Sequence, residues 1–428
     1  MARRYRFRRI LGCMLGSALA MGVRAGTGGP VPAADLAERP PALGEPIHTR
    51  FLGREIHFPG FDRRRLNAWT LGAAISFPTP GDRPVDPAGS LYLWRRPDTN
   101  HLLYGDIALV YNHLFHARSL RDGSPFEWVT TFENYTIPKL QQAELIDGQD
   151  DEDGETEWGY VRPGIGFGYR RQVGPAVDNL AAADLIVEPG LLYFGDHARR
   201  FRPPPDTFEL RSRLQLRWDR LRRNLLSLPD RGFAAGADGI WGWRARWRDW
   251  GVDRRENGHH HYLSGSGYAL AALPVPFAGG RHRLIAAVNA GITHHPDRFN
   301  RSVTRRLSGG INPLGMDFHT TGFPTLPGAA YLEFFPRHYA IGYGEYRFAP
   351  TFFSFVHLYG GAAHLDPIKY RHGRRQRHNT LMPFAGVRLS TGLPGGLLLV
   401  VDYAHNFGLR RGRTGYGNQV TVWVSGMF

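Results

Sequence analysis

The residues closest to a catalytic arrangement are His261 and Ser264, which a hydrolase could use as base and nucleophile. No Asn or acidic residue follows them at a spacing that would orient the imidazole. The single cysteine, Cys13, lies near the start of the chain, so the rest of the sequence has neither a disulfide framework nor thiol chemistry. The sequence also lacks a phosphate-binding loop, a paired-carboxylate motif and a Cys/His metal motif. We therefore expect a protein that is not an enzyme and carries no cofactor.

Histidines gather at two places in the second half of the chain. His259, His260 and His261 are consecutive, and His294 and His295 follow at the next expected loop. Imidazole nitrogens suit Zn²⁺ and related metals. Adjacent residues of a strand point to opposite faces, however, and no carboxylate completes a ligand set. We expect no metal site and regard His259 and His261 as weak candidates.

The first 25 residues have the pattern of a secretory signal peptide. Basic residues precede a short apolar stretch from Ile10 to Val23, and small residues flank a cleavage position after Ala25. These residues carry six arginines and no acid, so their removal lowers the formal charge from +15 to +9. The remaining chain has no run of 18 apolar residues, which excludes a transmembrane helix.

The remaining sequence predicts an all-β protein, a single transmembrane antiparallel β-barrel. Aromatic residues make up 13% of the chain, yet the mean hydropathy is −0.35, as expected where apolar and polar residues alternate along strands. Strand-like stretches of about ten residues are predicted at 66–77, 103–116, 126–138, 158–172, 184–196, 207–222, 233–249, 260–276, 283–294, 339–349, 355–364, 382–390, 397–407 and 419–428. Counting gives 14 strands, and only closure satisfies every backbone polar group in lipid.

The connections between these strands alternate between short and long. This pattern is typical of outer-membrane barrels of Gram-negative bacteria, which have short periplasmic turns and longer outer loops. We predict a barrel over 66–428, preceded by a linker or small plug over 26–65. The expected partners are outer-membrane lipids and lipopolysaccharide, with no nucleic acid, and the oligomeric state stays open.

Two neighbouring outer loops are rich in arginine. A guanidinium group binds phosphate in a bidentate manner. These side chains are candidates for contact with lipopolysaccharide, and exposed charges without a fixed partner are the alternative: Arg371, Arg374, Arg375, Arg377, Arg410, Arg411 and Arg413.

Three segments of the C-terminal half resemble the Omp85 family, the bacterial surface antigen barrels related to BamA and TamA. The first is Arg223-Asn224 followed by Pro229, Gly232 and Phe233. The second runs from Gly309-Gly310 through Thr321-Gly322-Phe323 to Glu345-Tyr346-Arg347. The third contains Asp402-Tyr403-Ala404 and ends at Phe428.

The resemblance covers about 207–428 and implies 16 strands. The two further strands are expected at Glu55–Pro59 and Leu91–Arg96. It also implies that the long loop 295–338 folds into the lumen, where Glu345 and Arg347, on one face of a strand, would anchor it. The chain departs from the family at Thr321, where an Arg is usual, and residues 26–65 are too few for a POTRA domain.

Two functions follow as hypotheses. The first is a barrel that assists insertion or translocation of a protein or lipid partner at the outer membrane, through a weak seam between its first and last strands. The alternative is an outer-membrane channel or surface receptor without protein-handling activity.

Overall fold

The computed structural model describes Leu36 and residues 41–427, with gaps. The longest gaps are 137–143, 300–324 and 367–380, and shorter ones lie at 43, 52, 59, 61, 83–84, 109, 147–148, 255, 257, 296, 331–332, 335, 394–395 and 412–414. The predicted signal peptide lies outside the described residues.

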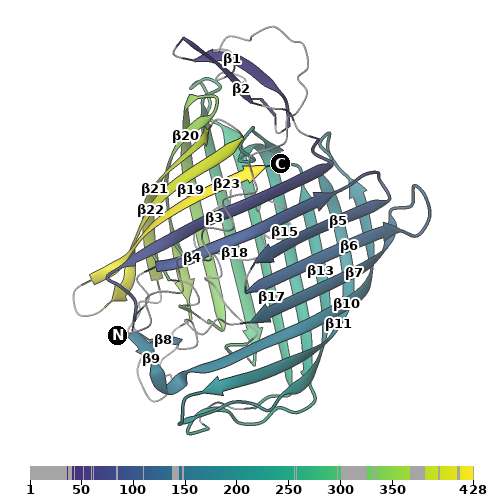
Figure 1. Cartoon of the computed structure of the whole chain (residues 1–428), viewed down its shortest axis with the longest axis vertical. Coiled ribbons are helices and arrows are strands. Elements are labelled where there is room, and N and C mark those ends of the chain that lie inside the picture. The colour runs from purple at the N-terminus through teal and green to yellow at the C-terminus, as the bar shows by residue number, and fades with distance from the viewer. Residues whose placement is uncertain are drawn as a thin grey trace, which may run out of the picture.

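Within the described chain, sixteen antiparallel strands form one closed barrel (Figure 1). In order round the wall they are β3 (Arg65–Phe77), β4 (Val85–Arg95), β5 (His101–Ala108), β6 (Tyr111–Ser119), β7 (Phe126–Thr136), β10 (Thr156–Gln172), β11 (Leu180–His197), β13 (Thr207–Asp219), β15 (Pro229–Arg244), β17 (His261–Pro274), β18 (His282–His294), β19 (His338–Thr351), β20 (Ser354–Leu365), β21 (Leu381–Leu393), β22 (Leu397–Arg411) and β23 (Gly415–Met427). Strand β23 pairs with β3 and closes the barrel.

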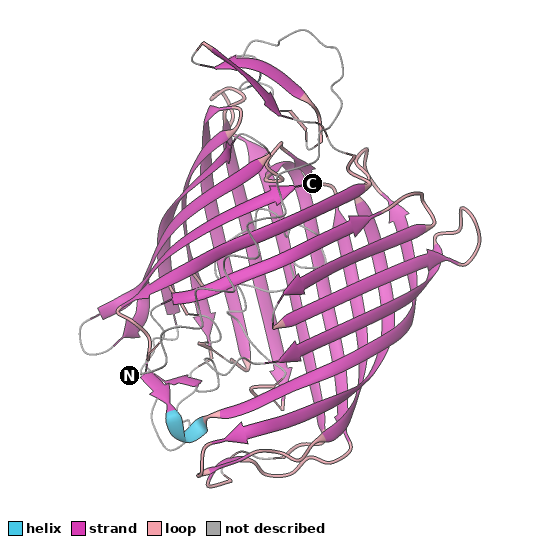
Figure 2. Ribbon diagram, viewed as in Figure 1, coloured by secondary structure: helices cyan, strands magenta, loops and turns pink. Residues whose placement is uncertain are grey.

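Short elements accompany the barrel. Strand β14 (Arg222–Arg223) pairs with the start of β15. Three small hairpins or bridges pair β1 (Ile47–Phe51) with β2 (Arg54–Phe58), β8 (Glu144–Ile146) with β9 (Gln149–Asp151), and β12 (Phe201–Arg202) with β16 (Gly251–Val252). The 3-10 turn η2 (Glu152–Gly154) is the helical element visible in Figure 2. Among the described residues, no helix has both the length and the apolar character needed to cross a membrane.

The strands form because alternate residues meet two different solvents. In β7, Glu127 and Glu133 are buried toward the lumen, whereas Phe126, Trp128 and Phe132 are exposed on the outer face. Apolar side chains outside and charged side chains inside are the reverse of a soluble protein, and they suit a wall surrounded by lipid. The predicted all-β transmembrane barrel is therefore confirmed, with 16 strands rather than the 14 counted.

The two additional strands do not both lie where they were expected. Leu91–Arg96 was correct, since Leu91 to Arg95 belong to β4. Glu55–Pro59 was wrong as a barrel strand, because β2 pairs with β1 outside the barrel. The sixteenth strand comes instead from the stretch 103–116, which is divided between β5 and β6 at 109–110. That break consists of apolar residues, without the Gly or Pro that would indicate a turn.

The two ends of the barrel differ. We call one the turn end, where β3 begins, β23 ends and the connections are 96–100, 120–125, 173–179, 220–228, 275–281, 352–353 and 394–396. At the other, the loop end, the connections include 137–155, 245–260, 295–337 and 366–380. The predicted alternation holds apart from two short connections at the loop end, 109–110 and 412–414.

Candidate functional site: the lumen and the closing seam

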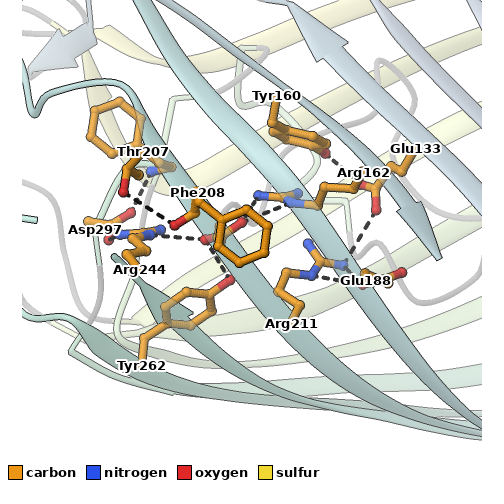
Figure 3. Close-up of polar contacts among 12 residues, drawn as sticks. Glu133, Tyr160, Arg162, Glu188, Thr207, Phe208, Arg211, Arg244, Tyr262 and Asp297 are labelled. Carbon is orange, nitrogen blue, oxygen red and sulfur yellow. Dashed lines mark hydrogen bonds and ion pairs between the residues drawn. The ribbon is translucent and has the colours of Figure 1, made fainter. Parts of the chain in front are cut away.

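A group of buried charged side chains lies inside the wall formed by β7 to β17. We call it the outer lumen cluster, and it consists of Glu133, Tyr160, Arg162, Glu188, Glu209, Arg211, Arg244, Tyr262 and Asp297 (Figure 3). Apart from Asp297, its residues come from the strands of this wall, at positions that face the lumen. A charged side chain on such a strand would otherwise have to face lipid.

Glu209 is the centre of this cluster. One carboxylate oxygen accepts from Arg162 at 2.5 Å, and the other accepts from Arg244 at 2.9 Å and from the hydroxyl of Tyr262 at 3.0 Å. Arg211 lies beside it and binds Glu188 at 2.7 Å. Because every one of these side chains is buried, each charge depends on its partner, and removing one would leave another uncompensated.

A second charged group lines the wall formed by β19 to β22. Glu345 accepts from the Tyr343 hydroxyl and lies 2.8 Å from Nδ1 of His357. Arg388 lies between two acids, with its Nε 3.0 Å from Asp402 and its Nη1 3.9 Å from Glu345. These contacts fasten β19, β20, β21 and β22 to one another from inside the barrel.

Both described ends of the long loop 295–337 lie in the lumen, on different walls. Near its start, Asp297 accepts from Arg244 at 2.5 Å, and Phe299 packs among the aromatic rings of Trp158 and Trp250. Near its end, residues 325–330 lie against the last two strands, and Glu333 pairs with Arg411 at 2.7 Å. These contacts come from described residues at both ends and indicate that the loop enters the lumen, as predicted.

The turn end is crossed by the connection 220–228. Leu225, Leu226 and Leu228 are buried in a core that also contains Phe58 of β2. A Cβ on Gly392 of β21 would lie 3.3 Å from Leu226 and 3.2 Å from Phe58. Strand β21 is separated from β15 by β17, β18, β19 and β20, so this connection reaches across the mouth of the barrel. Figure 1 shows hairpin β1–β2 beyond the barrel at the same end.

This closure was missed from the sequence. The first Omp85-like segment, 223–233, contains the Pro and Gly that are typical of a short turn. Turns are usually built from Gly, Pro, Asn, Asp and Ser. Three leucines within Asn224–Leu228 were therefore the signal of a buried connection.

The seam between β23 and β3 is closed by ten residue pairs, from Asn418–Phe77 to Met427–Ala68. It is not the shortest ladder, since β4 and β5 share six pairs. Its distinguishing feature is chemical. Among the neighbouring strand pairs of the described barrel, this is the one whose paired positions contain no Asp, Glu, Lys, Arg or His. No ion pair can therefore hold it from within the ladder.

The structure places Glu345 and Arg347 on the inner face of β19, both buried, as their spacing predicted. Their described partners belong to the barrel wall, and Arg347 donates to the Pro229 carbonyl oxygen of β15. Gly309, Gly310, Thr321, Gly322 and Phe323 lie outside the described residues, so contact between them and Glu345 stays a prediction.

In the C-terminal signature, Asp402 and Ala404 face the lumen and are buried. Tyr403 faces outward and donates its hydroxyl hydrogen bond to Asn418 of β23 at 2.9 Å. Phe428 lies outside the described residues. Trp423, an exception to the alternation of the predicted last strand, is inward-facing and packs in the core at the turn end.

Arg411 corrects one prediction. It is buried in the lumen against Glu333 and is therefore not available to lipopolysaccharide. Arg410, its neighbour, is exposed, and a lipopolysaccharide contact there stays a prediction. The other candidates, Arg371, Arg374, Arg375, Arg377 and Arg413, lie outside the described residues.

The histidine candidates do not converge. The ring of His261 lies 5.8 Å from that of Trp241 at the outer face, whereas the ring of His259 lies 3.8 Å from that of His295. Burial lowers the pKa of His295, and the neighbouring His259 and His294 lower it further. Among the described residues, no group of three metal-ligating side chains could hold an ion. Ser264 hydrogen-bonds Thr293 at 3.2 Å, on the opposite strand face from His261.

Solved structures resemble this fold, although no protein-family model and no curated protein matches the sequence. One is the crystal structure of BamA from Haemophilus ducreyi lacking POTRA domains 1–3, with 11% identity, a TM-score of 0.50, and coverage of 92% of this chain and 77% of that one. CdiB from Acinetobacter baumannii has 9% identity and a TM-score of 0.43, covering 91% and 64%. CdiB from Escherichia coli has 12% identity and a TM-score of 0.42, covering 92% and 69%. The fold is thus similar to that of the BamA barrel.

Proposed function

We propose that this chain is an integral outer-membrane protein that assists insertion or translocation of a protein partner, and that the partner engages the barrel at the seam between β23 and β3. The observation that carries the proposal is the absence of any ionisable side chain from the ten paired positions of the seam. Opening it breaks backbone hydrogen bonds and apolar contacts, but it leaves no buried charge without a partner.

The wall between β7 and β15 is fastened differently. Between β7 and β15, pairs such as Arg170–Glu127 at 2.8 Å and Arg217–Asp238 at 2.6 Å join strands from inside. Separating those strands would leave buried charges without partners, at a cost of several kcal/mol each. The seam therefore opens more easily than the wall between β7 and β15, and its opening would expose two strand edges for pairing with a partner strand.

The lumen contacts favour this function over the alternative of a passive channel. A barrel of 16 strands is wide enough to leave an aqueous channel when nothing enters it. Here the connection 220–228 crosses the turn end, and both described ends of loop 295–337 occupy the lumen. As part of the proposal, Glu345 and Arg347 hold the middle of this loop, so Glu345→Gln should speed protease cleavage within 300–324.

A disulfide lock tests the proposal. Ala73 and Val422 are paired across the seam, and cysteines at both positions lie within reach of a disulfide. The matched control places cysteines at Ala269 and Val288, which are paired between β17 and β18. We expect the seam lock to deplete one or a few outer-membrane or surface proteins, as deletion of the gene would, whereas the control leaves them unchanged.

An outer-membrane proteome that stays the same after both deletion and seam locking would refute the insertion role. Single-channel conductance that persists when 295–338 is deleted would then favour the channel or receptor.

A further inference from the structure

The seam strands share a sequence pattern that occurs nowhere else in the chain. Of the ten tryptophans, two are followed by glycine three residues later, in Trp69-Thr70-Leu71-Gly72 and Trp423-Val424-Ser425-Gly426. The first lies in β3 and the second in β23, the two strands that close the barrel.

The antiparallel register sets these two tetrapeptides directly opposite each other. Trp423 pairs with Gly72 and Gly426 pairs with Trp69, so each tryptophan faces the glycine of the other strand. Between them, the hydroxyls of Thr70 and Ser425 share a hydrogen bond of 2.9 Å. We call the two Trp–Gly pairs, Trp423–Gly72 and Trp69–Gly426, the seam clasp.

Each glycine is needed where it lies. A Cβ on Gly72 would be 2.5 Å from the Val422 carbonyl oxygen and 3.2 Å from the Trp423 ring. A Cβ on Gly426 would be 2.6 Å from Nε1 of Trp69. Trp423 and Gly72 face the lumen, whereas Trp69 and Gly426 face outward, so one indole covers the seam on each side.

Aromatic rings cover glycines elsewhere in the wall. Tyr262 and Tyr268 of β17 both lie over glycines of β15. Strands β20 and β21 cover each other, since Tyr359 lies over Gly386 and Phe384 lies over Gly361, but both of these rings are buried on the lumen face. The seam differs because its two rings are indoles that lie on opposite faces of the wall. Such a motif is self-complementary: a strand that slips by two residues loses both contacts at once.

We propose that the seam clasp fixes the register in which the barrel closes and selects the strand that binds β3 when the seam opens. The partner is an amphipathic β-strand with an aromatic residue opposite Gly72 and, three residues later, a glycine or other small residue opposite Trp69. The proposal has two halves. The register half, that the clasp fixes how the barrel closes, stands by itself. The selection half, that the clasp selects the partner strand, rests on the proposed function.

Cross-linking tests the register half without any partner. With Cys13→Ser, Ala73→Cys is combined with Val422→Cys, the paired position, or with Val420→Cys or Val424→Cys, two residues to either side. We expect the paired disulfide to exceed the slipped ones at least tenfold. In the Trp69→Leu/Trp423→Leu chain the slipped products should rise to a comparable yield. Trp128→Leu, on β7, is the matched control and should leave them absent.

A second variant guards against a chain that fails to fold. Trp69→Gly should permit slippage, and adding Gly426→Trp should restore the tenfold preference, because a tryptophan again faces a glycine on the outer side. Slippage that is absent from every folded variant, or a Gly426→Trp addition without rescue, would overturn the register half.

A peptide tests the selection half. A synthetic strand of residues 415–427 with Val422→Cys is added to the full chain carrying Ala73→Cys in detergent micelles. We expect a mixed disulfide, reduced at least fivefold when the peptide carries Trp423→Leu and Gly426→Leu. Equal yields, or no disulfide with either peptide, would overturn selection by the clasp. An unchanged proteome after seam locking would refute the proposed function while leaving the register result in place.

Discussion

Replacing Asp297 by Asn should release the first end of the long loop from the lumen wall. Asp297 accepts a 2.5 Å hydrogen bond from Arg244, which is fully buried. Breaking a buried ion pair costs about 3–5 kcal/mol when one charge is left alone. Arg244 keeps Glu209 at 2.9 Å, so we expect a smaller loss, about 2 kcal/mol, in the range for a hydrogen bond to a charged group. That corresponds to roughly a 30-fold increase in local opening, since 1.4 kcal/mol is tenfold.

Hydrogen–deuterium exchange of the folded protein in micelles measures this opening at Arg298 and Phe299. The matched control is Glu127→Gln, which removes a buried carboxylate from Arg170 at 2.8 Å without a described contact to the loop. Exchange at Phe299 should accelerate in Asp297→Asn and stay unchanged in the control. Equal exchange in wild type and Asp297→Asn would show that the Arg244 contact does not hold the loop, and the reasoning would fail.

Four further predictions follow from burial and charge. Leu226→Ala should lower the free energy of unfolding by about 3 kcal/mol, because it empties the core that closes the turn end, and urea titration in micelles measures the loss. Arg388→Met leaves the buried Asp402 without a cation, with the Tyr359 hydroxyl still donating to it at 3.0 Å, and should cost about 3 kcal/mol in the same assay; a change below 1 kcal/mol would contradict the pairing. The pKa of His295 is lowered, so its neutral form contributes stability above the ordinary value of 6.5 that is lost as pH falls through the lowered pKa; NMR titration should place it below 6.5, and His259→Asn should move it back toward that value. Leu358→Arg puts a charge on the lipid-facing side of β20 and should reduce stability by about 2–4 kcal/mol in bilayers, and little effect there would argue against a lipid-exposed wall.

Most of the barrel could be predicted from alternation, because each strand meets lipid on one side and the lumen on the other. In β23 the outward valines and inward polar residues could be predicted from the sequence. The division of 103–116 into two strands was not, since the break at 109–110 lacks Gly and Pro. The position of β2 outside the barrel could not be predicted either, because a strand of five alternating residues has the same sequence pattern in a small hairpin as in a barrel wall.

Of the candidate site, the sequence by itself determined that Glu345 and Arg347 share a face, because a strand repeats every two residues. It could not determine their partners. His357, Arg388 and Asp402 come from other strands, and which of them meet depends on register and closure. For the same reason Arg411 looked like an exposed loop arginine, and only the tertiary structure places it beside Glu333 in the lumen.

The seam shows the division most clearly. The sequence determined that β3 and β23 carry a Trp-x-x-Gly pattern and no ionisable residue at their paired positions. Only closure of the barrel brings these strands together, 354 residues apart at Trp69 and Trp423, in the register that sets each indole over a glycine. Local periodicity decides which way a side chain points, whereas long-range pairing decides what it meets there.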